Sequence, residues 1–280
     1  MNITFSGFAR FSTFLFCLVL AALSLSLSGC GKIKSTVHSL LLASRSSKSR
    51  PAPHPSRTTT SVPRLAIILD DVAGDPAAVD AIFSLHYPLT LSILPNHPRS
   101  TQIAQEAHRR GYQVMLHLPM ESLANESPES QELRPGMPPT EISSLLDAML
   151  TSVPYAAGVN NHQGSLATSN TRLMSGLMPV LRDHNLFFID SRTTATTVAY
   201  DAAHSAGIPC AFRNVPFLDD VQQVGVIRRQ LELAAKDARE KGQAIAIGHP
   251  HPETLRALSE FLPQAESEGI RLVHASDLVH

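Results

Sequence analysis

The chain has 280 residues, of which 43% are hydrophobic and 17% charged, and its formal net charge at pH 7 is -1. This length and apolar content allow one sizeable core, in one or two domains. The near-neutral charge, a sequence without Trp and an aromatic content of only 5% argue against a nucleic-acid-binding protein, which needs a basic face and stacking side chains.

The first thirty residues have the pattern of a leader. Arg10 precedes an apolar run at 11–27, and this charge, length and position are typical of a secretory signal peptide. The run closes with LSGC at 27–30, which resembles the lipobox of bacterial lipoproteins. That resemblance implies that Cys30 carries lipid and becomes the mature N-terminus, so we expect a membrane-anchored protein of the cell envelope that faces the periplasm. An ordinary signal peptide or a short membrane anchor is the alternative.

Residues 31–62 have a different composition, rich in Ser, Pro, Arg, Lys and Thr. Such a segment cannot bury enough apolar surface to fold alone, so we expect a flexible basic tether between the leader and a folded domain at 63–280. If the lipobox is real, Cys17 leaves with the signal peptide and Cys30 carries lipid, so Cys210 is the only free thiol that remains. No intramolecular disulfide is then expected, even in an oxidising compartment.

The folded domain begins with an apolar run at 65–69 that ends in two adjacent carboxylates, Asp70 and Asp71. The length of the run and the turn residues around it predict a strand buried on both faces. Ligands bind at the carboxyl ends of strands in parallel sheets, so this pair is a candidate site. Capping of the next helix is the alternative for either Asp.

The same alternation of helix and strand continues to the end of the chain. Helices are predicted at 77–85, 100–110, from 140, and at 169–184, 198–206, 221–241 and 253–268, and further strands at 89–94, 112–116, from 158, and at 186–189, 208–212, 244–247 and 270–273. A polar, proline-rich excursion at 124–139 is long enough for a lid or rim loop. About eight strands alternating with helices specify a parallel sheet, as a barrel or an open doubly wound sheet.

Ionisable side chains recur at these strand ends, namely Asp70, Asp71, His97, His117, Glu121, His162, Asp190, Arg192 and His249. One such His is usually structural, but the coincidence at successive strand ends favours a site. The sequence has no Cys-x-x-Cys pair, Walker loop, nucleophile elbow or dinucleotide fingerprint. Asp and imidazole ligands suit zinc or a similar divalent ion with an open position for a hydrolytic water.

Six motifs in order carry a family resemblance: LAIILDDV, LTLSILPN, GYQVMLHLPME, GVNNHQGS, FFIDSRTT and AIAIGHPHPETL. They resemble the divergent polysaccharide deacetylases, distant relatives of the NodB-type carbohydrate esterases, over residues 64–280. The resemblance implies a distorted (β/α) barrel of the polysaccharide deacetylase type as a single catalytic domain. It also implies a metal-dependent deacetylase, with zinc as the first choice of divalent metal, that removes N- or O-acetyl groups from an envelope polysaccharide or peptidoglycan.

The same resemblance implies the catalytic roles. Asp70 matches the catalytic base, and His249 matches the general acid that protonates the leaving group. Asn160 or Asn161 would help to hold the oxyanion.

The metal ligands match only in part. Asp71 and His117 fall on ligand positions of the family. Glu121 stands where the family motif has a second His. A carboxylate can ligate zinc, so His162 and Glu121 are competing candidates for the third ligand.

Other departures from the family pattern concern the base and the substrate. Asp190 and Arg192 only loosely fill the motif that tunes the base, and Arg192 would either orient Asp190 or meet an acidic group of the substrate. The Arg-Pro-Pro-Tyr-type motif is not recognisable. A catalytically inactive envelope lipoprotein that binds glycan or a protein partner is therefore an alternative, and so is a metal hydrolase for a non-sugar amide or ester.

Overall fold

The computed structural model describes residues 62–124 and 129–280. They lie in one compact unit. The expectations for the signal peptide, for lipidation at Cys30 and for the tether fall outside the described residues. Within those residues, none of the helices combines the length and the apolar character that a membrane span requires.

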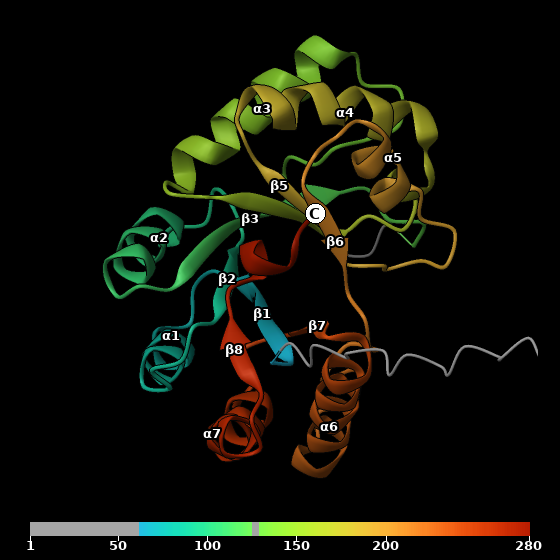
Figure 1. Ribbon diagram of the computed structural model, residues 1–280. Coiled ribbons are helices and arrows are strands. Elements are labelled where there is room, and N and C mark those ends of the chain that lie inside the picture. The colour runs from blue at the N-terminus through green and yellow to red at the C-terminus, as the bar shows by residue number, and fades with distance from the viewer. Residues whose placement is uncertain (1–61, 125–128) are drawn as a thin grey trace, which may run out of the picture. The chain divides into compact units, whose positions relative to one another are not determined.

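The described residues form one sheet of eight parallel strands in the order β6-β5-β4-β3-β2-β1-β7, with β8 also paired to β1. The strands are β1 (Arg64–Val72), β2 (Thr90–Ile93), β3 (Gln113–Met120), β4 (Gly158–Gln163), β5 (Phe187–Asp190), β6 (Cys210–Phe212), β7 (Gln243–Gly248) and β8 (Arg271–Val273). Figure 1 shows the sheet curled into a nearly closed barrel with the helices outside it. Between the barrel and the open sheet, the two architectures that the alternation allows, the structure selects the barrel, and the expected fold is confirmed.

The seam of the barrel lies between β6 and β7, which do not pair as strands. The segment after β6 bridges it: Asn214 donates its backbone N–H to Ile245 O at 2.9 Å and accepts from the Ile245 N–H through Oδ1 at 2.7 Å. Leu218 then donates its N–H to Ile247 O at 2.9 Å. This bridging segment lies next to the end of β7, where His249 follows.

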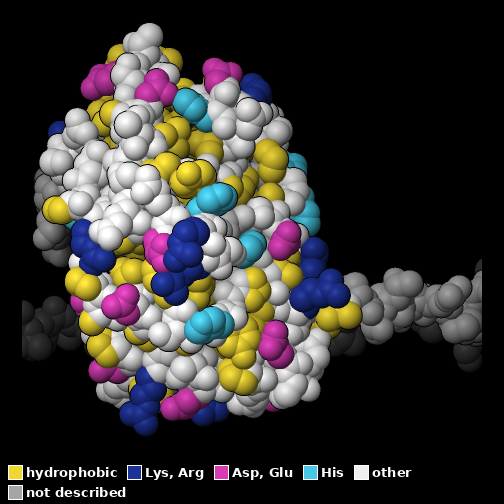
Figure 2. Space-filling model, turned by 90° about the vertical axis from the view of Figure 1, so that its left-hand side faces the viewer, with side chains coloured by type: hydrophobic (Ala, Val, Ile, Leu, Met, Phe, Trp, Pro, Cys, Tyr) yellow, Lys and Arg dark blue, Asp and Glu magenta, His cyan; other side chains and the backbone are white. Residues whose placement is uncertain are grey.

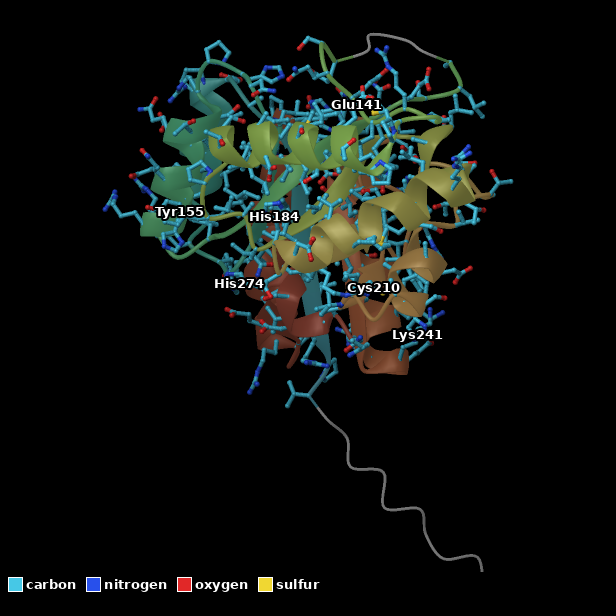
Figure 3. The ribbon with its side chains drawn as sticks, turned by 90° about the horizontal axis from the view of Figure 1, so that it is seen from above. Glu141, Tyr155, His184, Cys210, Lys241 and His274 are labelled. Carbon is cyan, nitrogen blue, oxygen red and sulfur yellow. The ribbon has the colours of Figure 1, made fainter. Side chains whose placement is uncertain are left out.

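The helices that cover the sheet are α1 (Pro76–Phe83), α2 (Ser100–Arg109), α3 (Pro139–Ser152), α4 (Thr171–Asp183), α5 (Ala199–Ser205), α6 (Val224–Lys241) and α7 (Pro252–Ser267). Figure 3 looks onto this outer layer from above, with Glu141 near the start of α3 and Tyr155 just beyond its end. On the face in Figure 2, side chains of both charge signs are scattered among uncharged ones, so this face has no continuous basic surface.

Side-chain alternation along β1 separates the two halves of the core. Leu65, Ile67 and Leu69 pack in the large cluster beneath the helices, whereas Ala66 and Ile68 pack in the smaller cluster with residues of β3, β5 and β7. Successive side chains of a strand point to opposite faces. The side chain of Asp70 therefore continues the row of Ala66 and Ile68 at the carboxyl end of the barrel.

The excursion predicted at 124–139 is partly paired to the sheet. Leu133 forms an isolated parallel bridge with Met120, donates its N–H to Pro119 O and accepts the N–H of Glu121, each at 2.9 Å. The side chains of His97 and Glu129 lie 3.4 Å apart and tie this rim to the end of β2. His97 is thus part of the rim rather than of the cluster described below.

Candidate metal centre

The two carboxylates at the end of β1 would point to opposite faces of a regular strand. The register with β2 shifts between Leu69 and Val72, and Asp71 has a left-handed backbone with a φ of 56°. A bulge of this kind re-aims one side chain. It turns the Asp71 carboxylate toward the same end of the barrel as Asp70, whose side chain is almost fully buried.

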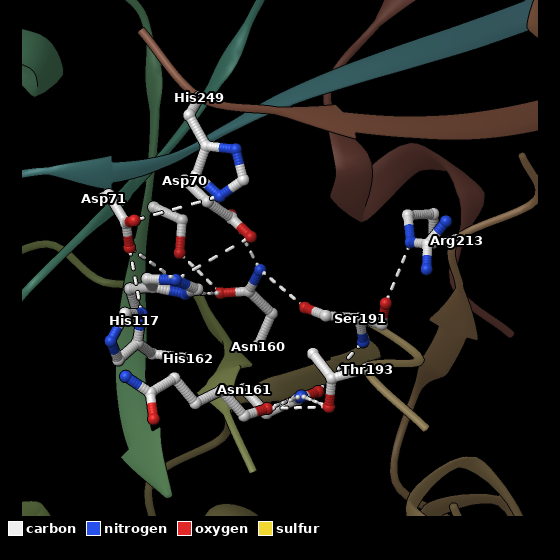
Figure 4. Close-up of polar contacts among 12 residues, drawn as sticks. Asp70, Asp71, His117, Asn160, Asn161, His162, Ser191, Thr193, Arg213 and His249 are labelled. Atoms are coloured by element: carbon white, nitrogen blue, oxygen red, sulfur yellow. Dashed lines mark hydrogen bonds and ion pairs between the residues drawn. The ribbon is translucent and has the colours of Figure 1, made fainter. Parts of the chain in front are cut away.

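Asp71 meets two imidazoles from neighbouring strands. Its Oδ1 atom lies 3.1 Å from Nε2 of His117 on β3 and 2.9 Å from Nδ1 of His162 on β4 (Figure 4). These three ligand atoms all lie within 4.8 Å of one another. Three of the four ligand candidates predicted from the sequence, Asp71, His117 and His162, therefore lie together.

A buried carboxylate oxygen without a hydrogen-bond partner supports a metal site at this position. Asp71 Oδ1 is buried and has no hydrogen-bond partner of acceptable geometry, although two ring nitrogens lie close to it. Burial disfavours the charged form of Asp71, but the imidazoles of His117 and His162 outweigh burial and hold its pKa below the usual range. One carboxylate oxygen and two imidazole nitrogens that face each other are a donor set that fits a divalent ion such as zinc.

Glu121 does not join this group of atoms. Its backbone N–H donates to Leu133 O, and its carbonyl accepts the N–H groups of Leu166 and Ala167 at 3.2 and 3.0 Å. These bonds fix Glu121 between two rim segments just beyond the end of β3. The structure therefore places His162, not Glu121, beside Asp71 and His117, and the expectation that Glu121 competes for this position is not supported.

Asn160, the fully buried residue two before His162 on β4, joins the other groups. Its Nδ2 donates to Asp70 Oδ1 at 2.8 Å and to Ser191 Oγ at 3.1 Å. Its Oδ1 accepts from His117 Nδ1 at 2.8 Å and from Ser92 Oγ at 2.5 Å. Without a metal, burial lowers the pKa of His117, but the charges of Asp70 and Asp71 outweigh burial and raise it. Because the carboxylate of Asp70 requires a donor, the amide oxygen faces His117, so in the neutral form of the ring the proton lies on Nδ1. The Nε2 lone pair is then left for a metal.

The neighbouring Asn161 has a different set of partners. Its Oδ1 accepts the Ser191 N–H at 2.9 Å, and its Nδ2 lies 2.8 Å from Gln163 O and 3.4 Å from Thr193 Oγ1. The amide hydrogens of both Asn residues are therefore directed at protein acceptors. This corrects the expectation that Asn160 or Asn161 holds the oxyanion, since neither has an N–H left for it.

The environment of Asp70 suits a base. Burial raises its pKa, and the charges of His117 and His249 together with the Asn160 hydrogen bond oppose this effect only in part. Its Oδ2 atom lies 3.7 Å from His117 Nε2. A carboxylate with a raised pKa holds a proton more firmly than an ordinary one, which favours general-base chemistry.

His249, just beyond β7, faces the same centre from the opposite side. Its Nε2 lies 3.8 Å from Asp71 Oδ2, and its Nδ1 lies 3.0 Å from Asp219 Oδ1. Burial lowers the pKa of His249, but the hydrogen bond to Asp219 and the charge of Asp70 outweigh it and raise the pKa to about 9. The ring is therefore protonated at neutral pH and can act as a general acid.

Asp219 is a site residue that the sequence reasoning missed. Besides the ring of His249, it accepts the His249 N–H at 2.6 Å and the Thr254 hydroxyl at 2.8 Å through Oδ2. His251 also lies within 4.8 Å of this pair, but both oxygens of Asp219 already accept hydrogen bonds. The one sequence signal was an Asp pair at 219–220 after a predicted strand, which is also typical of an exposed loop.

Asp190 and Arg192 do not tune the base as expected. The Asp190 carboxylate accepts the N–H groups of Arg192 and Tyr200 at 2.8 and 3.3 Å and the Thr197 hydroxyl at 2.9 Å. It therefore orders the turn after β5. The Arg192 guanidinium lies 3.6 Å from the centroid of the Phe212 ring, so this side chain does not orient Asp190. Asn160, rather than Asp190, contacts the base.

Comparison with known proteins gives the family of the chain. The model of a family described as divergent polysaccharide deacetylase matches residues 67–279. An uncharacterized protein of Escherichia coli K12, YibQ, is 39% identical over 217 residues, which cover 78% of this chain and 67% of the relative. An uncharacterized protein of Haemophilus influenzae is 35% identical over 215 residues, which cover 77% of this chain and 76% of the relative.

Solved structures share the fold at low sequence identity. An uncharacterized protein from Agrobacterium tumefaciens C58 superposes with a TM-score of 0.73 at 23% identity, covering 79% of this chain and 91% of that protein. A T48 deacetylase solved with substrate gives 0.51 at 14% identity, covering 78% and 90%. A pseudoenzyme of carbohydrate esterase family 4 from Bacillus anthracis gives 0.51 at 11% identity, covering 78% and 66%.

Proposed function

Because the chain belongs to the divergent polysaccharide deacetylase family, we propose that it is a metal-dependent hydrolase that removes acetyl groups from a cell-envelope polysaccharide or peptidoglycan. The observation that carries the proposal is the orphaned Oδ1 of Asp71 between two imidazole nitrogens, with a buried carboxylate and a protonated His beside it.

Asp71, His117 and His162 would hold the metal, and the donor set of one oxygen and two nitrogens suits zinc. Bound there, zinc would polarise the acetyl carbonyl and make water more acidic. Asn160 supports this role, because it holds His117 in the tautomer that presents Nε2.

The chain's own residues account for the proton transfers. Asp70 takes a proton from the attacking water, and the Asn160 amide fixes Oδ1 of that carboxylate at 2.8 Å. His249 donates the proton on Nε2 to the departing amine or alcohol, while Asp219 stabilises the charged ring through Nδ1. The general acid and the general base thus both lie next to the residues that would hold the metal, where hydrolysis needs them.

A binding protein without catalysis is the second candidate, favoured by Glu121 in place of a His of the family motif and by a fold shared with a pseudoenzyme. The position of His162 supports the enzyme, because this residue supplies the nitrogen that Glu121 lacks. We also propose, from the sequence at 27–30, a lipid anchor at Cys30 and a location facing the periplasm.

The experiment that tests the proposal measures acetate released from acetylated glycans by the zinc-loaded protein, with peptidoglycan and N-acetylglucosamine oligomers as substrates. We expect release by the native protein and a loss of roughly 100-fold or more in Asp70→Asn and His249→Ala, the scale of general acid-base catalysis. Glycan binding without acetate release would support the binding protein. Acetate release from non-sugar amides or esters alone would contradict the proposed substrate class.

A further inference from the structure

Two arginines beside the candidate centre lie on aromatic rings. The guanidinium of Arg192, after β5, lies 3.6 Å from the centroid of Phe212, and that of Arg213, after β6, lies 4.0 Å from the centroid of Phe217. We call these four residues the arginine ledge. Among the residues that the structure describes, no carboxylate oxygen lies within 4.0 Å of either guanidinium, whereas Arg109 pairs with an acidic neighbour.

The two charges of the ledge repel each other. Burial lowers the pKa of Arg213, and the nearby charge of Arg192 acts in the same direction, against the attraction of Asp220 and Asp70. The carboxylates of Asp220, Asp70 and Asp190 attract Arg213 from a distance, but none of them forms an ion pair with either guanidinium, so both remain open to a ligand of opposite charge. The ledge is thus a place of positive potential beside the site.

Arg213 holds the backbone at Arg192. Its Nε donates to Ser191 O at 2.9 Å and its Nη2 to Arg192 O at 3.1 Å, while Nη1 donates to Val215 O. Arg192 itself has a left-handed backbone with a φ of 52° and an exposed side chain. Its guanidinium makes no hydrogen bond to any described residue. The Phe212 ring beneath the guanidinium and the Arg213 bond to the Arg192 backbone therefore position a planar fork of donors before a ligand arrives, which reduces the entropy lost on binding.

The ledge adjoins the general acid. The ring centroids of Phe217 and His249 lie 5.6 Å apart, and Arg213 lies on the same Phe217 ring. On the other side, Ser191 accepts from Asn160 and Arg213, so it connects the ledge to the hydrogen bonds around Asp70. Figure 4 shows Arg213 beyond Ser191 as seen from Asp70.

We propose that the arginine ledge is a subsite for an anionic sugar and that Arg192 binds a carboxylate carried near the acetylated group of the substrate. Arg213 donates hydrogen bonds to three carbonyl groups, so the guanidinium of Arg192 is the one that remains free. Two parallel N–H groups of one guanidinium match the two oxygens of one carboxylate. This inference rests on the proposed function and names the substrate class: an acidic, N- or O-acetylated glycan rather than a neutral one.

The test compares two glycans of the same shape. A tetrasaccharide of alternating N-acetylglucosamine and N-acetylmuramic acid carries carboxylates, and its methyl ester does not. Affinities are measured by calorimetry on the zinc-loaded chain with Asp70→Asn, which prevents turnover. We expect the acid to bind about tenfold or more tightly than the ester, with a preference that falls as salt rises, because opposite charges are screened. Arg192→Gln should abolish the preference.

Arg271→Gln is the matched control. Arg271 is an exposed arginine at the start of β8, at the opposite end of the barrel, and its removal should leave the preference intact. Three outcomes would overturn the subsite: equal binding of acid and ester by the Asp70→Asn chain with Arg192 intact, a preference that survives Arg192→Gln, or binding of neither glycan. If the Asp70→Asn chain prefers the acid but the native protein, with Asp70 intact, releases no acetate, the proposed function is contradicted and the subsite stands.

Discussion

Asp219 holds His249 at two points: its Oδ2 accepts the backbone N–H at 2.6 Å, and its Oδ1 lies 3.0 Å from the ring nitrogen Nδ1. The two residues come from different loops on either side of α6. A carboxylate in this position orients the ring, stabilises its charged form and leaves Nε2 directed at Asp71.

Replacement of Asp219 should therefore lower the pKa of His249. In metal-free Asp219→Asn, we expect the pKa to fall from about 9 toward the ordinary value near 6.5, because an amide cannot stabilise the imidazolium as a carboxylate does. Histidine ring resonances followed by NMR across this pH range measure the shift. An unchanged pKa would contradict the assigned role of Asp219.

The contact between Asp219 and His249 should also make the stability of the fold depend on pH. The folded pKa of His249 lies above the unfolded value, so its contribution is complete below about pH 6.5 and is lost as pH rises through about 9. We expect the advantage of the native protein over Asp219→Asn, on the order of 1 to 3 kcal/mol, to shrink across this window. Urea unfolding at pH 6 and pH 9.5 checks it, and a gap that widens with pH would contradict the prediction.

Removal of the Asn160 amide should weaken metal binding. Asn160→Ala deprives His117 of the acceptor that fixes its tautomer and deprives Asp70 of a donor. We expect a 10- to 100-fold loss of zinc affinity, the scale seen when the hydrogen-bond partner of a metal ligand is removed. Competition with a chelating dye measures the affinity.

Asn161→Ala is the control for this prediction. Asn161 is the adjacent residue of the same type, but its partners are Gln163 at the end of β4 and the turn after β5, and it contacts neither His117 nor Asp70. It should lower the free energy of unfolding while changing zinc affinity far less. Equal losses of affinity in both variants would show that Asn160 acts only through folding.

The left-handed backbone of Asp71 predicts a contrast between two substitutions. At a φ of 56°, glycine is unstrained, whereas alanine keeps the steric cost of its Cβ. In the metal-free protein, Asp71→Gly should be more stable than Asp71→Ala by about 1 kcal/mol. This reverses the usual order in strands, where glycine weakens the structure. Equal unfolding free energies would indicate that the bulge relaxes when the carboxylate is removed.

Gly158, at the start of β4, should tolerate no side chain. A Cβ there would lie 2.4 Å from the Phe187 ring, so Gly158→Ala should cost about 1 to 3 kcal/mol through overpacking. Gly225→Ala in α6 is the control, since its nearest neighbour would be the tip of Arg229 at 3.9 Å. That change should be neutral or stabilising. Thermal unfolding distinguishes the two, and similar melting temperatures would contradict the packing argument.

The sequence predicts the strands well because each is a short apolar run that ends in a turn, and it predicts the ends of those strands as the site. Asp70, His117 and His249 follow from that rule. Closure of the barrel does not follow, because alternation alone allows an open sheet. The contact between Asp219 and His249, which are 30 residues apart on either side of the seam, depends on that closure and left no local pattern to find.

The sequence does not predict the roles of the polar residues at 160, 161 and 190, for a different reason. The residue types at 160, 161 and 190 are right for catalysis, but their function depends on which hydrogen-bond partners the fold supplies. Asn160 turns inward to Asp70, whereas Asp190 is used by backbone N–H groups of its own turn. The left-handed backbone of Asp71, which brings both carboxylates to one place, likewise depends on the register with β2.

Metal content of the purified protein tests the central claim most directly. After loading with zinc and removal of excess, we predict about one zinc per chain in the native protein, retention in Glu121→Gln and loss in Asp71→Ala and His162→Ala, because these two residues would each supply one ligand atom to the proposed metal site. No bound zinc in the native protein, or retention in His162→Ala with loss in Glu121→Gln, would contradict the account.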